Sequence, residues 1–550
     1  MRASTALFAG LSPKITEISR LSGIPGVSVG VIDNGDIVHQ ASYGLCDVEN
    51  EIPCDSESVF VIGSVSKAFT ATLLAHLVGE GRLNWTDSIS QILPEFQRPS
   101  SDLSSHATVA DLLSHHAGLS AFDSLWLGSD NIPLLDRSDS INILSYLPQE
   151  KPFRGSWLYN NFAFDVLGHV IERISGSSYS SFLHDHLLQP LGMKRTYYTE
   201  AAGQLENEAK PYAALADASP VRISPALAGE NVLMGPAGGI RSCVSDLLII
   251  YNALMDAAAE DMEVNTAPKP ARKNRPLALS QLPAMWTGWN VLPMPLVREH
   301  SAGYGWLRAQ LPSVLAQHRG DPELSPLVGA GAPSRLAIWH SGDIAGYQTH
   351  VTLFPETKQA VVVLSNSESL NDGSKYISDL LIEALLDNLD NAPDYVEIAR
   401  KTAAMAASRM DGVYKNLMDG RTRSKPSRTP RTYTGKYFNA VENFFIDIFL
   451  QEDSLYLSFM GRERDTFMLE AYGDDNFFWF LTHDEAARLA RDDGYGTEFY
   501  ILRFGSVGGD SNVIDTLWWK HEPSLSQSGE AFKRQMENPK MMVQGASLEL

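Results

Sequence analysis

The feature that most constrains this chain is an apolar stretch that runs directly into a serine and a lysine at the start of a helical pattern. Residues 59–63 are apolar, residues 64–67 read Ser-Val-Ser-Lys, and residues 68–78 have the composition of a buried helix. Residues three apart share one face of a helix, and the first N–H groups of a helix lack intrahelical partners. The spacing therefore predicts a nucleophile, Ser64, beside a base, Lys67. Lysine can accept a proton near neutral pH only where its surroundings lower its usual pKa of about 10.4.

Two further segments carry groups that suit such a site. In residues 155–161, Tyr159 and Asn161 come just before an apolar periodic run, which predicts a loop that leads into a helix. In residues 338–342, the sequence Ile-Trp-His-Ser-Gly precedes two strand patterns. A glycine at a strand edge lets a ligand approach the backbone closely.

With these three motifs, in this order, the chain resembles the serine β-lactamase and penicillin-recognising family. Within it, the chain is most similar to the class C β-lactamase-like branch, which also contains esterases, D-stereospecific aminopeptidases and acyltransferases of fungal polyketide pathways. The resemblance covers roughly residues 15 to 390. Four more segments are similar to the family: 108–119, 188–193, 235–240 and 303–306.

The resemblance implies a role for each site residue. Ser64 would attack a carbonyl group, and Lys67 and Tyr159 would share the general-base work. The backbone N–H groups of Ser64 and Asp343 would form an oxyanion hole, with Asp343 directly after Gly342. Asn161 would orient Lys67 and the substrate, although a helix cap is an alternative role for it.

His340 is a departure from the family, because many β-lactamases have lysine at this position. Lysine supplies a fixed positive charge for a substrate carboxylate, whereas histidine is mostly neutral at pH 7. Antibiotic hydrolysis is therefore not the expected activity. The chain also has no second acidic motif of the class A type for activating a deacylating water, so deacylation would use Tyr159 and Lys67. An acyl-enzyme in such a site could react with water or with a second nucleophile.

The patterns predict an α+β fold in which an antiparallel sheet, formed by both ends of the first domain, is flanked by helices. Asn34-Gly35 is a strong hairpin signal between the first two strands. We assign residues 1–415 to a β-lactamase/transpeptidase-like domain with an insertion at about 256–300, and residues 416–432 to a linker. Residues 433–550 read as seven short alternating strands and resemble a small lipocalin-like antiparallel β-barrel.

Two parts of this organisation leave alternatives open. The basic, proline-rich residues 267–276 read as a loop, and the aromatic residues after them either line a substrate entrance or pack on the surface of their own domain. A β-barrel can bind a ligand, but its interior is more often filled by side chains.

Composition excludes several functions. A net charge of −22 argues against nucleic-acid binding, and no window has about 18 consecutive apolar residues, so no membrane span is expected. The three cysteines, Cys46, Cys54 and Cys243, lack metal-like spacing and suit packing thiols in a reducing, cytoplasmic compartment. The histidine pairs at 115/116 and 184/186 lack a third ligand, so neither a metal nor another cofactor is expected.

The sequence thus predicts a serine hydrolase or transesterase that forms an acyl-enzyme from a small ester, thioester or amide. An acyl-carrier thioester is one candidate partner, and secondary metabolism is one candidate setting. A D-amino-acid peptidase is a second enzymatic reading, and a binding or sensor protein without turnover is the alternative from another class. The sequence does not define the oligomeric state.

Overall fold

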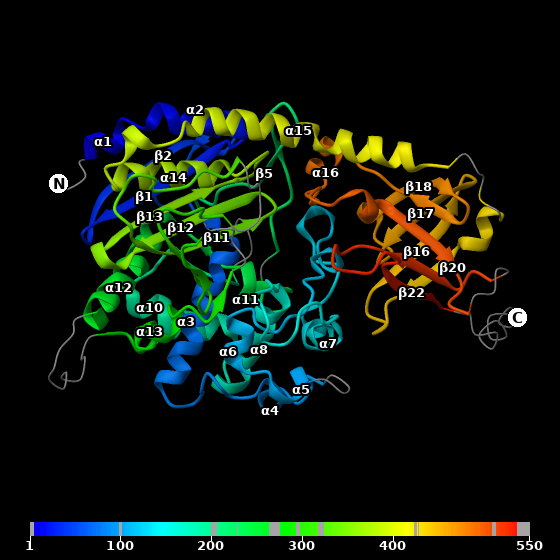
Figure 1. Ribbon diagram of the computed structural model, residues 1–550, viewed down its shortest axis with the longest axis horizontal. Coiled ribbons are helices and arrows are strands. Elements are labelled where there is room, and N and C mark those ends of the chain that lie inside the picture. Colours follow the sequence, from blue (N-terminus) through cyan, green and yellow to red (C-terminus); the bar gives the residue numbers. More distant parts are fainter. Residues whose placement is uncertain are drawn as a thin grey trace, which may run out of the picture. The chain divides into compact units, whose positions relative to one another are not determined.

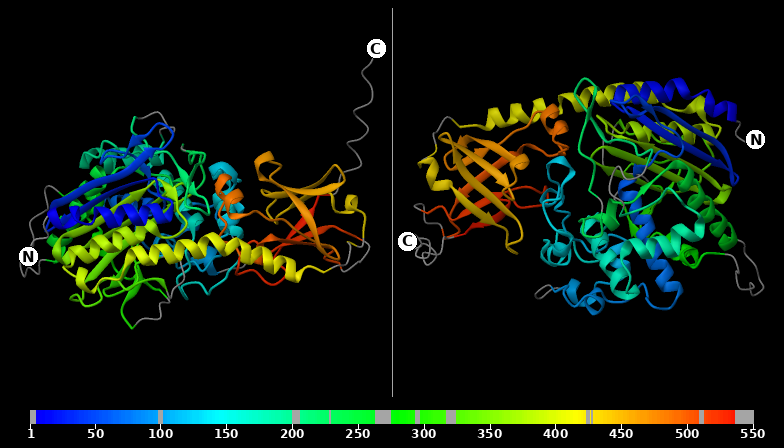
Figure 2. Two further views of the ribbon diagram at one scale, coloured as in Figure 1. Left: turned by 90° about the horizontal axis from the view of Figure 1, so that it is seen from above. Right: turned by 180° about the vertical axis from the view of Figure 1, so that it is seen from behind.

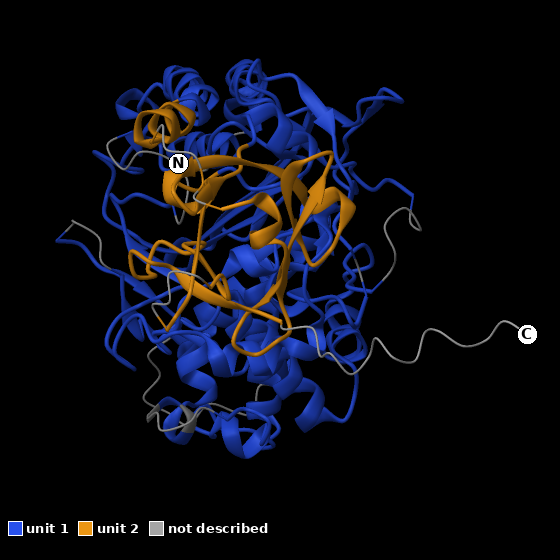
Figure 3. Ribbon diagram, turned by 90° about the vertical axis from the view of Figure 1, so that its right-hand side faces the viewer, with its two compact units in different colours: residues 1–411, 481–493 blue, residues 412–480, 494–550 orange. Residues whose placement is uncertain are grey.

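The computed structural model describes residues 5–97, 102–199, 206–227, 229–262, 275–292, 297–316, 324–422, 426, 428–508 and 513–535. The chain forms two compact units, which are coloured separately in Figure 3. Unit 1 comprises residues 1–411 and 481–493, and unit 2 comprises residues 412–480 and 494–550. Residues 481–493 therefore belong to unit 1 although they interrupt unit 2 in the sequence.

Unit 1 is built around an antiparallel sheet whose described strands run in the order β3-β2-β1-β13-β12-β11-β10-β9-β8. β1 pairs with β2 on one side and with β13 on the other, so strands from both ends of the unit meet at the centre. The bounds are β1 Gly26–Asp33, β2 Asp36–Asp47, β3 Ile52–Pro53, β8 Asn290–Val291, β9 His300–Ala302, β10 Leu307–Gln310, β11 Leu336–Ile344, β12 Tyr347–Phe354 and β13 Gln359–Ser365. The expected α+β sheet is confirmed, and so is the hairpin, because Asn34 and Gly35 both have positive φ.

Helices cover both faces of this sheet (Figure 1 and Figure 2). On one face, Val29 lies in a buried apolar cluster with side chains of α2 and α14. On the other face, a Cβ on Gly30 would lie 2.8 Å from Val244 and 2.9 Å from Leu248, so α12 packs closely on the strand. Successive strand residues point to opposite faces, which explains this alternation. The helix bounds are α2 Ser12–Ser22, α3 Ser66–Gly79, α12 Val244–Met262 and α14 Gly373–Leu385.

Two helices position the expected motifs. α3 follows strand β4 (Phe60–Val61) and the short helix η1 (Gly63–Val65), and every side chain of α3 from Ser66 to Leu77 is buried. This fits the prediction of a buried helix. α8 (Asn161–Ser175) begins after Asn160, whose side chain accepts a hydrogen bond from the N–H of Ala163. The cap of this helix is thus Asn160 and not Asn161.

Unit 2 contains a closed barrel of strands β15 to β22. Buried aromatic side chains of this unit pack on one another: Phe459 lies 5.0 Å from Trp519 and 5.7 Å from Trp479, measured between ring centroids. This packing favours a barrel interior filled by side chains over one that holds a ligand cavity. The last strand lies beyond the seven that the sequence predicted. The bounds are β15 Gly435–Phe438, β16 Phe445–Gln451, β17 Ser454–Phe459, β18 Thr466–Gly473, β19 Asn476–Phe478, β20 Ile501–Gly505, β21 Thr516–Trp519 and β22 Glu530–Arg534.

The structure describes the expected insertion and linker only in part. Residues 263–274, which contain most of the basic segment, lie outside the described residues. The aromatic part supplies β8 and β9 of the main sheet, and Trp289 stacks on Tyr304 at 5.5 Å. A helix, α15 (Tyr395–Gly420), runs into the expected linker. Among the described helices, none is long and apolar enough to cross a membrane.

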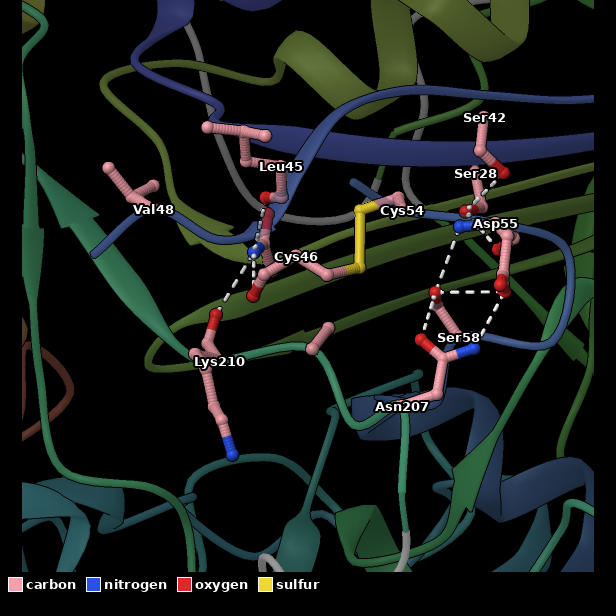
Figure 4. The surroundings of a disulfide bond; sticks show 12 residues. Ser28, Ser42, Leu45, Cys46, Val48, Cys54, Asp55, Ser58, Asn207 and Lys210 are labelled. Atoms are coloured by element: carbon pink, nitrogen blue, oxygen red, sulfur yellow. Dashed lines mark hydrogen bonds between the residues drawn. A yellow bond between two sulfur atoms is a disulfide. The ribbon is translucent and has the colours of Figure 1, made fainter. Parts of the chain in front are cut away.

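The cysteine prediction is wrong for two of the three residues. Cys46 and Cys54 form a disulfide, with Cα atoms 4.8 Å apart (Figure 4). Cys243 is buried and free. The hairpin of β2 and β3 pairs Leu45 with Pro53, which brings the two cysteines together. Spacing alone could not show this pairing.

Candidate active site

Ser64 and Lys67 meet at the junction of η1 and α3. The Lys67 Nζ lies 2.9 Å from the Ser64 Oγ and donates to the backbone oxygen of Ala237 at 2.8 Å. Lys67 is fully buried, and burial lowers its pKa to about 7, while the charge of Asp123 opposes this shift. A substantial fraction of the amine is therefore neutral near pH 7 and able to accept the proton of Ser64.

Tyr159 lies against the same pair from the loop before α8. The Lys67 Nζ is 4.8 Å from the centroid of the Tyr159 ring. Burial raises the pKa of Tyr159 well above its usual value of 10, and a hydrogen bond with Ser64 only partly offsets this. His115 packs on the Tyr159 ring at 4.5 Å, and its Nδ1 accepts the N–H of Asn160. The phenol is thus held in place and stays protonated.

The side-chain amide of Asn161 donates a hydrogen bond to Asp123 at 3.0 Å. Asp123 begins the short helix η2 (Asp123–Leu125) and also accepts from the Trp126 indole N–H at 2.8 Å. Burial raises the pKa of Asp123, and the charge of Lys67 lowers it. Asn161 therefore holds Asp123, whose charge raises the pKa of Lys67 against the larger effect of burial.

Backbone packing places the expected oxyanion donors side by side. Gly63 has φ of +52°, and a Cβ there would lie 2.6 Å from the backbone N of Asp343. A Cβ on Gly342 would lie 1.9 Å from the Ile62 oxygen and 3.1 Å from the backbone N of Ser64. Only glycines allow strand β11 to approach η1 this closely.

His340 lies on β11, on the same face as Gly342, because strand residues two apart share a face. Its side chain is buried, and its Nδ1 lies 2.5 Å from the backbone oxygen of Ser341. This contact fixes the ring orientation beside the site.

The structure thus brings Ser64, Lys67 and Tyr159 into one buried cluster, with Gly342 and Asp343 against Ser64. Sequence reasoning missed Asp123 and the supporting role of His115. Asp123 has no motif of its own, and the adjacent pair His115 and His116 carries no signal for packing on Tyr159. Among the described residues, no group of three or more His, Cys, Asp or Glu side chains is arranged to hold a metal.

Comparison with known proteins identifies the family. A beta-lactamase family model matches residues 14–386. The chain belongs to this family. It is 25% identical over 458 residues to "Unguisins hydrolase ungD" of Aspergillus violaceofuscus, covering 79% of this chain and 76% of the relative. It is 27% identical to a beta-lactamase of Pseudomonas fluorescens, covering 63% of this chain and 90% of the relative.

A solved structure, the octameric penicillin-binding protein homologue from Pyrococcus abyssi, is similar in fold to this chain. The TM-score is 0.54 at 19% identity, and the match covers 96% of this chain and 99% of the other. The β-lactamase-like fold with a C-terminal antiparallel barrel is therefore confirmed. Relatives in this family are named as a hydrolase and as a beta-lactamase.

Proposed function

We propose that the protein is a serine hydrolase that works through an acyl-enzyme on Ser64. The observation that carries the proposal is the fully buried Lys67, whose amine lies 2.9 Å from the Ser64 hydroxyl and has its pKa lowered to about 7. A buried lysine without a directly paired carboxylate is costly for stability, and such groups concentrate at functional sites.

The chemistry follows from the two shifted pKa values. The neutral Lys67 amine takes the Ser64 proton while the Oγ attacks the carbonyl carbon. The negative charge on the former carbonyl oxygen is stabilised by the backbone N–H groups of Ser64 and Asp343. The protonated Tyr159 passes a proton to the leaving group and regains one from Lys67, and the leaving group departs to give the Ser64 ester.

Deacylation reverses these steps with a new nucleophile. Water attack gives hydrolysis, and attack by an alcohol, thiol or amine gives acyl transfer. We propose hydrolysis as the main outcome, since the relatives are named as hydrolases and beta-lactamases. Acyl transfer in secondary metabolism, with a small ester, an amide or an acyl-carrier thioester as donor, is the second outcome. One relative is named for the hydrolysis of unguisins. A D-amino-acid peptidase activity is a further candidate outcome, and the same test covers it.

One expectation about the substrate stays a prediction, and the structure argues against the expected cytoplasmic location. His340, where many β-lactamases have lysine, supports a substrate without the carboxylate that β-lactams carry. The Cys46–Cys54 disulfide counts against a cytoplasmic location, because disulfides persist mainly in oxidising compartments.

Fluorophosphonate labelling followed by peptide mapping tests the proposal. We expect one adduct, on Ser64, and none in Ser64→Ala. Incubation with an ester, thioester and amide panel, with and without amine or alcohol acceptors, then separates hydrolysis, transfer and a trapped acyl-enzyme by mass spectrometry. Labelling at Ser66 or Cys243 instead of Ser64 would contradict the assignment, and a Ser64 adduct that never turns over would favour the binding or sensor function.

A further inference from the structure

The backbone oxygen that accepts from Lys67 belongs to a short helix, α11 (Gly235–Gly238), which is labelled in Figure 1. The Lys67 Nζ donates to the Ala237 oxygen at 2.8 Å, and the Thr70 Oγ1 donates to the Pro236 oxygen at 2.7 Å. Lys67 and Thr70 are three residues apart, so they share one face of α3. Two side chains of one helix therefore bind two consecutive carbonyl groups of α11.

Thr70 is fully buried, and its hydroxyl group both donates and accepts a hydrogen bond. The hydroxyl has one hydrogen, which goes to Pro236. The hydroxyl of Tyr179, in helix α9 (Tyr179–Leu183), therefore donates to the Thr70 Oγ1 at 2.7 Å. A valine at position 70 would fill nearly the same volume, but it would leave the Pro236 carbonyl without this donor.

The two ends of α11 are held by other side chains. Before α11, Met234 has φ of +67°, which non-glycine residues adopt rarely, and its N–H donates to the Asp165 Oδ1 of α8 at 3.0 Å. After α11, the N–H of Ile240 donates to the Ser66 Oγ at 3.1 Å. These bonds fix the ends of α11, whereas Thr70 fixes its middle, directly beside the carbonyl group that Lys67 contacts.

The Ala237 carbonyl sets the direction of the Lys67 lone pair. A neutral amine has two N–H groups and one lone pair, and it rotates about the bond between Cε and Nζ. When one N–H donates to Ala237, the lone pair can face the Ser64 hydroxyl, 2.9 Å away. Proton transfer needs this alignment as well as a short distance. The carbonyl dipole also stabilises the protonated form of the amine.

We propose that Thr70 is a positioning residue for acylation, because its hydroxyl holds the peptide between Pro236 and Ala237 so that the Ala237 carbonyl orients Lys67 toward Ser64. This inference rests on the proposed acyl-enzyme function of Ser64. Thr70 acts through α11, and the bond-forming groups remain those around Ser64. It therefore affects the rate of bond formation and not the affinity for the substrate.

Fluorophosphonate labelling at rising probe concentrations, repeated across a pH series, tests the proposal. In Thr70→Val, the maximal rate of labelling should fall about ten- to a hundredfold, as expected for a misplaced base. The half-saturating probe concentration should stay within about twofold of the wild-type value, because Thr70 does not act on binding. The midpoint of the rate's rise with pH should move below the wild-type midpoint, because the protonated amine loses the carbonyl dipole.

Two more variants at this position make the test independent of one substitution. Thr70→Ser keeps the hydroxyl group and should restore both the rate and the midpoint. Thr70→Ala removes the hydroxyl with a smaller side chain and should reproduce the result of Thr70→Val. Cooperative melting checks that each variant is folded. The other groups that face the Lys67 amine, Ser64, Tyr159 and Asp123, are the same in all of these proteins.

The matched control is Thr72→Val. Thr72 is also buried on α3, but its hydroxyl donates to the backbone oxygen of Ala68 in the same helix at 2.7 Å. Its replacement should leave the rate and the midpoint near the wild-type values. An equal loss in Thr72→Val would show that any buried hydroxyl of α3 has this effect, and the inference would be wrong.

The remaining outcomes separate the inference from the proposed function. If Ser64 is labelled in wild type and equally fast in folded Thr70→Val or Thr70→Ala, Thr70 does not position the base. A slower rate with an unchanged or higher midpoint also overturns the inference, because the carbonyl group would then not be what Thr70 holds against Lys67. In both cases the proposed function stands. If wild-type Ser64 is not labelled at all, the proposed function fails, and the inference fails with it.

Discussion

Replacing Lys67 by methionine should remove catalysis and make the protein more stable. The pKa of Lys67 falls from its ordinary 10.5 to about 7 because of burial. A pKa difference of one corresponds to about 1.4 kcal/mol, so the folded state disfavours the charged amine by roughly 5 kcal/mol. Methionine has a similar length and no charge, and it avoids this penalty.

Two lost hydrogen bonds oppose the gain. Lys67 donates to Ser64 and to the backbone oxygen of Ala237, and losing such partners costs about 1 to 3 kcal/mol in total. The net expectation for Lys67→Met is a stabilisation of about 2 to 4 kcal/mol at pH 6, together with at least a hundredfold slower acylation.

The pH dependence of this gain has a definite sign. A lysine whose folded pKa is lowered binds fewer protons in the folded state than in the unfolded state between pH 7 and pH 10.5. The penalty is therefore complete below about pH 7 and disappears as the pH rises toward 10.5. The stability advantage of Lys67→Met should shrink across that window.

Calorimetric melting and urea unfolding between pH 6 and pH 10 provide the measurement. The matched control is Lys375→Met, because Lys375 is also buried but is paired with Asp379 at 2.5 Å. Its replacement leaves a buried carboxylate without its partner, which typically costs about 3 to 5 kcal/mol. A Lys67→Met protein that is less stable than wild type at pH 6, or whose stability difference does not change with pH, would refute the reasoning.

Three further predictions concern the same site. The rate of acylation should rise with pH around a midpoint near 7, and a flat profile would count against Lys67 as the base. The double variant Lys67→Ala/Tyr159→Phe should acylate little more slowly than the worse single variant. Fully additive losses would show that the two residues have separate roles. Gly342→Ala should still fold but should acylate about a hundredfold or more slowly in stopped-flow labelling, because the added methyl group forces the oxyanion donors apart. A near-normal rate would mean that β11 supplies no donor. A chain that ends after Met418 should still be labelled at Ser64. Its substrate preference should change, because it lacks residues 481–493 of unit 1. Complete loss of labelling in a well-folded protein would show that this segment is needed for catalysis.

The sequence was sufficient to predict the main sheet and the cluster around Ser64. The reason is that strand and helix periodicity are local signals, and that Ser64 and Lys67 lie three residues apart on one helix. The hairpin at Asn34-Gly35 was equally readable, since its turn needs residues that tolerate positive φ.

Other features depend on contacts between distant segments and could not be read locally. Asp123 has no distinctive neighbours in the sequence, yet the fold places it against Asn161. The Cys46–Cys54 disulfide follows from the register of a very short strand pair. The segment 481–493 lies between two barrel strands in the sequence, and only its packing assigns it to unit 1.

Asp123→Asn isolates the influence of this carboxyl group on the base. The charge of Asp123 raises the pKa of Lys67, in opposition to the larger effect of burial. Asparagine keeps an oxygen that can accept from Asn161 and Trp126 but carries no charge. The pKa of Lys67 should therefore fall, and the rise of the acylation rate with pH should move below the wild-type midpoint near 7. The pH profile of fluorophosphonate labelling measures this shift. A midpoint that stays in place would mean that Asp123 is already protonated beside Lys67. A midpoint that moves upward would show that Asp123 serves mainly to keep water away from the amine. Either result would show that the charge of Asp123 does not control the pKa of Lys67.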